Sequence, residues 1–455
     1  MFKSIKAYIV NFFTKGHSRT LKAKKHASLS IVYRGIDLLI GLALVPLVLE
    51  YLDETRYGIW MVLISITTYF RFMNIGLANG LRNKLAESKA KGEMEKARHY
   101  VSTTYAGITA ISLSFFLIFL IINNFLDWTK ILNTSNELKN ELSVLALIVF
   151  GSFSLRFILK IITTIAMADQ KPSVKNLSNL LERIIKLIFV LLAIHLLPSS
   201  LLTLGIGYSI TPIIILGSLT IYFFATQYKN IRPSLSYVKF SYLKDLMNLG
   251  IKFFVISIAA VILFTTDNLI ITQLFGPDQV TPYQITHKYF NLSFMFFIIL
   301  VQPLWSAVTD AFEKNDFKWI QNIMKKMTKV WVLFAIGTFG MLIISPFVFN
   351  VWIGDKVNIP LTLSISWMVF IIIHSYNTLY THFINGVGKL KIQLIITIIS
   401  IIFNIPLSIF LAKYLNMESS GVIVATTFFI VISLILYKIQ YKKIINHKAN
   451  GIWNK

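Results

Sequence analysis

About twelve apolar stretches, each long enough to cross a lipid bilayer, constrain the fold of this 455-residue chain more than any other feature. A hydrocarbon core of about 30 Å requires about 20 helical residues. The sequence therefore predicts an all-α polytopic membrane protein with about 12 transmembrane helices. The expected spans lie at roughly 27–50, 57–80, 99–122, 142–166, 178–197, 201–226, 247–275, 284–309, 328–352, 361–386, 392–414 and 420–438.

The composition excludes a string of soluble domains. Hydrophobic residues make up 55% of the chain and charged residues 14%, whereas soluble proteins carry about 25% charged residues. The chain also has no cysteine. This rules out disulfide scaffolds, thiol nucleophiles and sites in which cysteine holds zinc or an iron–sulfur cluster.

The positive charges are distributed unevenly along the chain. Of the 44 Lys and Arg residues, 31 fall in termini and loops on one side of the expected helices, five in loops on the other side and eight within helices. Cytoplasmic loops are enriched in Lys and Arg, so both termini are expected in the cytoplasm. The net charge of +24 then indicates topology and contact with anionic membrane lipids, and no nucleic-acid partner is expected.

The expected helices divide into two halves of six, which can be laid over each other at an offset of about 224 residues. Because six is even, the halves have the same orientation, and we expect a pseudo-two-fold axis along the membrane normal with a central cavity. The expected parts are an amphipathic and basic cytoplasmic segment at 1–26, an N-terminal half at 27–226, a cytoplasmic linker at 227–246, a C-terminal half at 247–438 and a basic cytoplasmic tail at 439–455.

The sequence does not indicate an enzyme. The expected outer loops are short, and the phosphate-binding pattern GxxxxGK[ST] is absent. We find no set of side chains spaced for covalent or general acid–base catalysis. A helical bundle with few soluble appendages suits a transporter or flippase without a metal or a bound cofactor.

Two segments resemble the polysaccharide-export and O-antigen flippase family: VPLVLEYLDETRYGIWMVLISI at 45–66 and NIGLANGLRNKLAESKAKGEMEKARHYVST at 74–103. The shared elements are Gly58 after the first span, the GLxNGLRNKLAE pattern at the end of the second, and a turn at Gly92 before a charged helix. This family is part of the multidrug, oligosaccharidyl-lipid and polysaccharide exporter superfamily.

The resemblance implies a transport function. It implies that the chain moves an undecaprenyl-diphosphate-linked oligosaccharide, for O-antigen lipopolysaccharide or another surface polysaccharide, across the bacterial plasma (inner) membrane by alternating access. A polysaccharide polymerase and a chain-length regulator are the protein partners to consider. H+ or Na+ is the candidate coupling ion.

Such a cargo needs buried cations to replace the hydration of its diphosphate, and a cation at mid-membrane depth usually faces a partner or a wet cavity. Arg34 and Asp37 lie at i and i+3 in the first span. They form either an intrahelical salt bridge or a cavity site in which Asp37 holds Arg34 until the diphosphate arrives. Arg71 has no carboxylate on its own turn and is the best single diphosphate candidate, because a guanidinium matches phosphate oxygens bidentately. A partner on a neighbouring helix, or snorkelling, is its alternative.

Charges on the fourth and fifth expected spans have a more structural interpretation. Arg156 and Lys160 share one helix face, as do Glu182 and Lys186, with Arg183 alongside. We expect an ion-pair cluster between these two spans near the inner surface.

Two further residues are candidates in the C-terminal half. Asp267 has no cation on its own helix, so it is either an ion-coupling carboxylate or a hydrogen-bonded structural residue beside Asn268. Lys288 is either a second cation for the cargo or a snorkelling interface residue.

Other functions remain open at this point. A cation-coupled small-molecule or drug exporter of the same superfamily is the main alternative. It would favour an acidic cavity, whereas eight cations within the spans outnumber three acids, Asp37, Glu182 and Asp267. This imbalance favours an anionic cargo. A membrane scaffold and a lipid II flippase are weaker alternatives.

Overall fold

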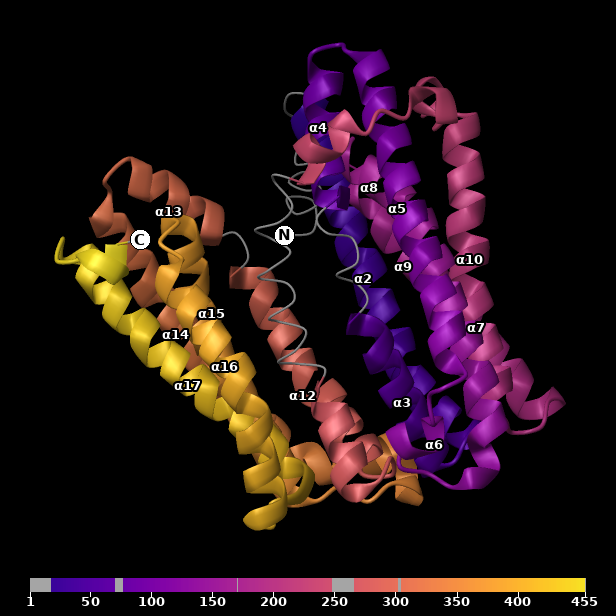
Figure 1. Cartoon of the computed structure of the whole chain (residues 1–455). Helices are drawn as coiled ribbons and strands as arrows, with labels where there is room; N and C mark the ends of the chain where they lie inside the picture. Colours follow the sequence, from indigo (N-terminus) through magenta and orange to yellow (C-terminus); the bar gives the residue numbers. More distant parts are fainter. Residues whose placement is uncertain (1–17, 70–76, 170, 248–265, 302–303, 455) are drawn as a thin grey trace, which may run out of the picture. The chain divides into compact units, whose positions relative to one another are not determined.

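The computed structural model describes residues 18–69, 77–169, 171–247, 266–301 and 304–454 (Figure 1). These residues form helices and no strand, which confirms the predicted all-α fold. Eight of the described helices are long and apolar enough to cross a membrane. The chain is therefore a multi-pass membrane protein.

The expected number of about twelve spans stays a prediction. The spans expected at 178–197 and 284–309 fall mainly on the described helices Pro172–Leu196 and Val280–Val301, which are not among the eight. The first of these helices carries four charged side chains, whereas the second carries only Lys288. Those expected at 57–80 and 247–275 include residues outside the described part of the chain.

The described residues pack into two units that do not follow the order of the sequence. Unit 1 takes its residues from Met1–Leu52, Phe70–Thr129 and Ser135–Ser257. Unit 2 takes its residues from Asp53–Tyr69, Lys130–Thr134 and Ile258–Lys455. The symmetry between two six-helix halves stays a prediction.

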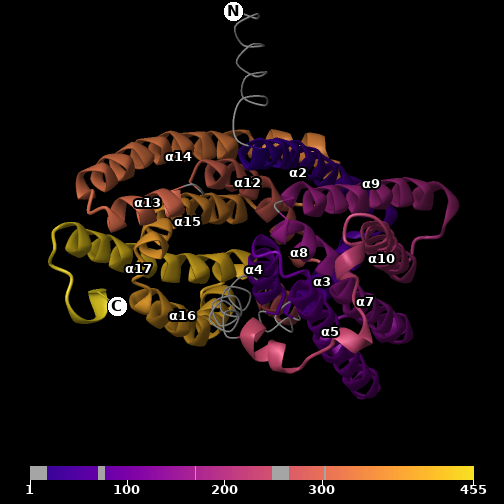
Figure 2. The ribbon, with the colours of Figure 1, turned by 90° about the horizontal axis from the view of Figure 1, so that it is seen from above.

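Unit 1 contains seven of the described helices. They are α2 (Ser18–Tyr51), α4 (Leu77–Ala90), α5 (Met94–Asn123), α7 (Lys139–Leu159), α8 (Ile161–Ala168), α9 (Pro172–Leu196) and α10 (Leu201–Ala225). Helix α2 lies along α9 in both views (Figures 1 and 2), and α7 packs between α5 and α10. Leu77, Leu81 and Leu85 repeat every four residues on α4 and are buried against α5 and α8. This spacing is that of one helix face.

Unit 2 is built around α15, which contacts α12, α13, α14 and α17. Its helices are α3 (Glu54–Tyr69), 266–275, α12 (Val280–Val301), α13 (Leu304–Glu313), α14 (Phe317–Ile353), α15 (Leu361–Val387), α16 (Lys391–Ile409) and α17 (Glu418–Ile445). Short α6 (Trp128–Ile131) lies where the chain passes from unit 1 to residues of unit 2. Phe383 and Ile384 of α15 lie in the apolar core of unit 2 together with Phe297 of α12.

Polar residues mark several helix ends. The side chain of Asp316 accepts a hydrogen bond from the backbone N–H of Trp319 (2.9 Å) at the start of α14. Ser200 does the same for Thr203 (3.3 Å) at the start of α10. These caps satisfy backbone donors that have no partner within the helix.

The absence of a side chain at Gly58 lets α3 approach the segment before α12. A Cβ atom on Gly58 would overlap the backbone carbonyl of Pro277. The hydroxyl of Thr281 donates a hydrogen bond to the carbonyl of Glu54 (2.8 Å) at the same junction. The glycine of the first family-like segment is thus required by a close approach of two backbones.

Gly58→Ala should lower the thermal stability of the protein, because the added methyl group forces the two backbones apart at a cost of about 1–3 kcal/mol. The midpoint of thermal unfolding in detergent measures the effect. Gly217→Ala on α10 is the matched control, since, apart from the neighbouring backbone of α10 itself, no atom lies within 4 Å of the Cβ position at Gly217. Equal midpoints for the two variants would contradict the proposed role of Gly58.

Candidate functional site

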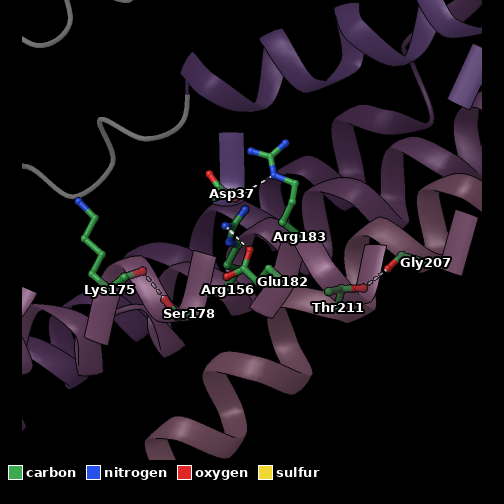
Figure 3. Close-up of polar contacts among 8 residues, drawn as sticks. All are labelled: Asp37, Arg156, Lys175, Ser178, Glu182, Arg183, Gly207 and Thr211. Carbon is green, nitrogen blue, oxygen red and sulfur yellow. Dashed lines mark hydrogen bonds and ion pairs between the residues drawn. The ribbon is translucent and has the colours of Figure 1, made fainter. Parts of the chain in front are cut away.

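One turn of α9 connects two neighbouring helices of unit 1 through ion pairs (Figure 3). A guanidinium nitrogen of Arg156 on α7 donates to the carboxylate of Glu182 at 2.7 Å. Arg183, the next residue, donates to the carboxylate of Asp37 on α2 at 2.9 Å. Consecutive residues of a helix point about 100° apart, so one turn reaches both partners. The expected ion pairing between the fourth and fifth spans is confirmed for Arg156 and Glu182 and extends to the first span, while its position near the inner surface stays a prediction.

Arg34 and Asp37 both contact α9 rather than each other. The Nε of Arg34 donates to the side-chain oxygen of Asn176 at 3.3 Å, while Asp37 pairs with Arg183. The intrahelical salt bridge, one of the two interpretations of this pair, is therefore wrong, and so is the contact by which Asp37 would hold Arg34 in the other interpretation. Binding of a diphosphate by these residues stays a prediction. Sequence spacing suggested a pair between Arg34 and Asp37 because residues at i and i+3 are neighbours on a helix. In the structure each of the two side chains binds a residue of α9 instead.

This cluster contains more cations than acids. Lys186 lies one turn beyond Glu182, with its ammonium 4.9 Å from the centre of the Tyr208 ring. In the described part of unit 1, no carboxylate lies within 4.0 Å of Lys186. The Nε of Arg156 is buried without a hydrogen-bond partner there. Four cations, Arg34, Arg156, Arg183 and Lys186, thus accompany two carboxylates, Asp37 and Glu182.

Asp267 lies in unit 2, in the helix at 266–275, and only 4% of its surface is exposed. The hydroxyl of Tyr283 on α12 donates to one carboxylate oxygen at 2.6 Å. The other oxygen, Oδ1, is buried and has no hydrogen-bond partner among the described residues. Asp267 is therefore hydrogen-bonded, as the structural interpretation expects, and its role in ion coupling stays a prediction.

The residue after Asp267 connects three segments of unit 2. Asn268 donates to the hydroxyl of Ser65 on α3 (2.6 Å) and accepts from the amide of Gln284 on α12 (2.7 Å). This network holds the backbone of 266–275 in place next to the carboxylate.

Lys288 is half-buried on α12, and its ammonium donates to the hydroxyl of Tyr57 on α3 at 2.6 Å. The neighbouring His287 stacks on Trp367 of α15, with ring centres 4.6 Å apart. Lys288 thus reaches a protein partner on α3, within unit 2. Its role in binding a cargo stays a prediction.

Arg71, the predicted diphosphate ligand, lies outside the described residues. Within the described ranges, no group of three or more His, Asp or Glu side chains is arranged to hold a metal ion. Sequence reasoning did not select Arg183, Lys186 or Tyr283 as site residues. The charges on α9 were visible, but their partners on α2 and α10 depend on helix packing.

Comparisons with known proteins agree on a family and a fold. The family model described as polysaccharide biosynthesis protein matches residues 23–308, and the model described as MatE matches residues 253–410. The chain is 23% identical to a protein of Salmonella typhi named as an O-antigen transporter, over 74% of this chain and 76% of that protein. It is also 23% identical to a protein of Yersinia pseudotuberculosis named as an O-antigen export protein, over 79% and 82%.

A solved structure has a similar fold. It is an inward-facing multidrug resistance MATE family transporter of the MOP superfamily, with a TM-score of 0.75 and 11% identity. The similarity covers 92% of this chain and 100% of that structure. At this level of identity the likeness shows the fold alone.

Glu182→Gln should destabilise the protein, because Arg156 keeps its charge in the protein interior after its partner is neutralised. Breaking a buried ion pair costs about 3–5 kcal/mol, and the 34% exposure of Arg156 should reduce this cost. Thermal unfolding in detergent and the amount of protein in the membrane are the measurements. Combining Glu182→Gln with Arg156→Gln should restore part of the loss, since the charge that Glu182 balances is then removed as well.

Glu87→Gln on α4 is the control for this prediction. Hydrogen bonds from Lys91 and Lys84 lower the pKa of Glu87, but the pairs are exposed and such pairs contribute little. A larger loss from Glu87→Gln than from Glu182→Gln would show that the cluster on α9 is not a structural support.

Proposed function

We propose a function on the basis of family membership. The chain belongs to the polysaccharide biosynthesis protein family, whose model covers residues 23–308. By this membership it is a transporter and not an enzyme. Its cargo is an undecaprenyl-diphosphate-linked oligosaccharide, the repeat unit of O-antigen or another surface polysaccharide. The protein flips this cargo from the cytoplasmic to the outer leaflet of the plasma membrane by alternating access.

The cation excess in unit 1 is the observation that carries this proposal. Two of the four cations are matched by Asp37 and Glu182, which leaves two positive charges without an acid among the described residues of the cluster. In a low-dielectric environment such an excess favours an anion. A diphosphate supplies the missing negative charge, and the names of the two bacterial relatives, an O-antigen transporter and an O-antigen export protein, support a polysaccharide cargo.

The residues predicted from the sequence take defined roles in this proposal. Arg34, Arg71 and Lys288 bind the diphosphate and its first sugars, and Asp37 orients the cations around it. The excess of Lys and Arg on one side predicts that both termini are cytoplasmic. A polysaccharide polymerase and a chain-length regulator are the proposed protein partners at the outer leaflet.

Deleting the gene in its host should cause complete lipid-linked oligosaccharides to accumulate and the surface polymer to disappear. The wild-type gene should restore the polymer, whereas Lys186→Gln should restore about a tenth or less at equal protein level. Lys186 is chosen because Glu182 and Asp37 form their ion pairs with Arg156 and Arg183. Both carboxylates therefore keep their partners when Lys186 is replaced. Lipid extraction and quantification of the surface polymer measure both effects.

Two variants control this test. Lys186→Arg keeps the charge and should restore export, while Lys84→Gln removes a cation from the exposed pair with Glu87 and should have no effect. Full export by Lys186→Gln would contradict the role of the cation excess. Normal surface polymer in the deletion strain would refute the flippase function itself.

The buried carboxylate of Asp267 is the proposed site of H+ or Na+ coupling. Its unpartnered oxygen can accept a proton or contact a small cation. Asp267→Asn should make cargo movement in vesicles insensitive to an imposed pH or Na+ gradient. Tyr283→Phe, which keeps the carboxylate and removes its hydrogen bond, should remain sensitive; an unchanged gradient response in Asp267→Asn would refute this role.

A cation-coupled exporter of small molecules is the second candidate, because the MatE model matches residues 253–410. For this function the deletion strain should keep its polymer and become sensitive to cationic compounds. The same strain therefore distinguishes the two functions.

A further inference from the structure

The segment 227–246 is packed onto unit 1 along its whole length. It contains two short 3₁₀ helices, Lys229–Ile231 and Leu235–Tyr237, and the start of a helix at 241–247. Ile231 and Leu246 are buried in the apolar core that includes α4 and α5. A Cβ atom on Gly80 of α4 would overlap the backbone of Leu246.

Hydrogen bonds fix this segment to one part of α5. The backbone N–H of Ser234 donates to the hydroxyl of Ser102 at 3.2 Å, and that of Lys239 donates to the hydroxyl of Thr103 at 3.1 Å. His99 contacts the carbonyl of Tyr237 at 2.8 Å. The segment is therefore held at the height of residues 98–103 of α5.

The length of α5 indicates where its residues 98–103 lie relative to the bilayer. Its 30 residues span about 45 Å at 1.5 Å per residue, about 15 Å more than a hydrocarbon core. The apolar part of α5 is its C-terminal two thirds, whereas residues 94–103 read MEKARHYVST. The contacts with 227–246 are therefore expected in the layer of lipid headgroups next to the core.

The outward surface of the segment combines exposed apolar side chains with cations. Leu235 is 89% exposed and Phe240 is 72% exposed. Arg232, Lys239 and Lys244 are also exposed, and none has a carboxylate within 4.0 Å in the part of the chain that the structure describes. One acid of the segment, Asp245, is exposed as well.

We propose that 227–246 is a membrane-binding surface: Leu235 and Phe240 insert into the adjacent leaflet, and Arg232, Lys239 and Lys244 bind the headgroups of anionic phospholipids. Apolar side chains flanked by cations are the pattern by which interfacial segments bind such membranes. The position of the segment along α5 favours lipid as the binding partner of this surface. A protein in solution would have to reach into the headgroup layer to bind there. The inference does not depend on the transported cargo.

The absence of cysteine in the chain allows a direct test. A spin label is attached to Leu235→Cys or Phe240→Cys in the full-length protein, reconstituted in vesicles containing phosphatidylglycerol. Oxygen, which concentrates in the membrane, should increase the spin relaxation rate of both labels. A water-soluble nickel chelate should have little effect on that rate, because the labels are protected from it. A label at Glu87→Cys, on an exposed part of α4, should show the reverse.

Lipid composition and charge variants complete the test. In the labelled proteins, Arg232→Gln, Lys239→Gln and Lys244→Gln together should raise nickel accessibility at least twofold in phosphatidylglycerol vesicles and leave it unchanged in phosphatidylcholine. Labels at 235 and 240 as accessible to nickel as the label at 87 would overturn the proposal. Protection in native membranes but not in vesicles of purified lipid would also overturn it, and would assign the surface to a protein partner.

Discussion

A hydrocarbon core offers no water to a charged side chain, so each charge placed there must find its counterpart within the protein or its cargo. In unit 1 one turn of α9 meets this requirement for Arg156 and for Asp37. Glu182 and Arg183 are consecutive, and through them α9 reaches α7 on one side and α2 on the other. Side-chain charges thus connect α9 to two helices in a layer whose apolar surfaces alone give little specificity.

Sequence predicted the helices well because their signal is local. Apolar runs of about 20 residues identify spans. It could not assign partners to the charges, because partners are set by tertiary packing. Asp37 and Arg183 are 146 positions apart, whereas spacing within one helix suggested Arg34 as the partner. The carboxylate and the guanidinium were both visible; the contact of α2 with α9 was not.

The site in unit 2 shows a similar limit. Sequence selected Asp267 because it has no cation on its helix, and the buried carboxylate has none within salt-bridge distance in the described residues. Tyr283 was not selected, although it is only 16 positions away. Asn268 and Gln284 are separated by the same 16 positions. Both contacts therefore follow from one alignment of the helix at 266–275 along α12. The turn that joins the two helices determines this alignment.

The assignment of α3 to unit 2 has a consequence for the order in which the protein assembles. Tyr57 and its partner Lys288 are 231 residues apart, so α3 is synthesised long before the helix on which it packs. The helices that flank α3 in the chain, α2 and α4, belong to unit 1. Insertion into the membrane and final packing must therefore be separate events for α3. A nascent chain that stops before α12 would hold α3 with its glycine surface uncovered. If the chain were divided in the linker, the C-terminal fragment would lack α3, which belongs to its unit, and the N-terminal fragment would carry α3 without its partner on α12.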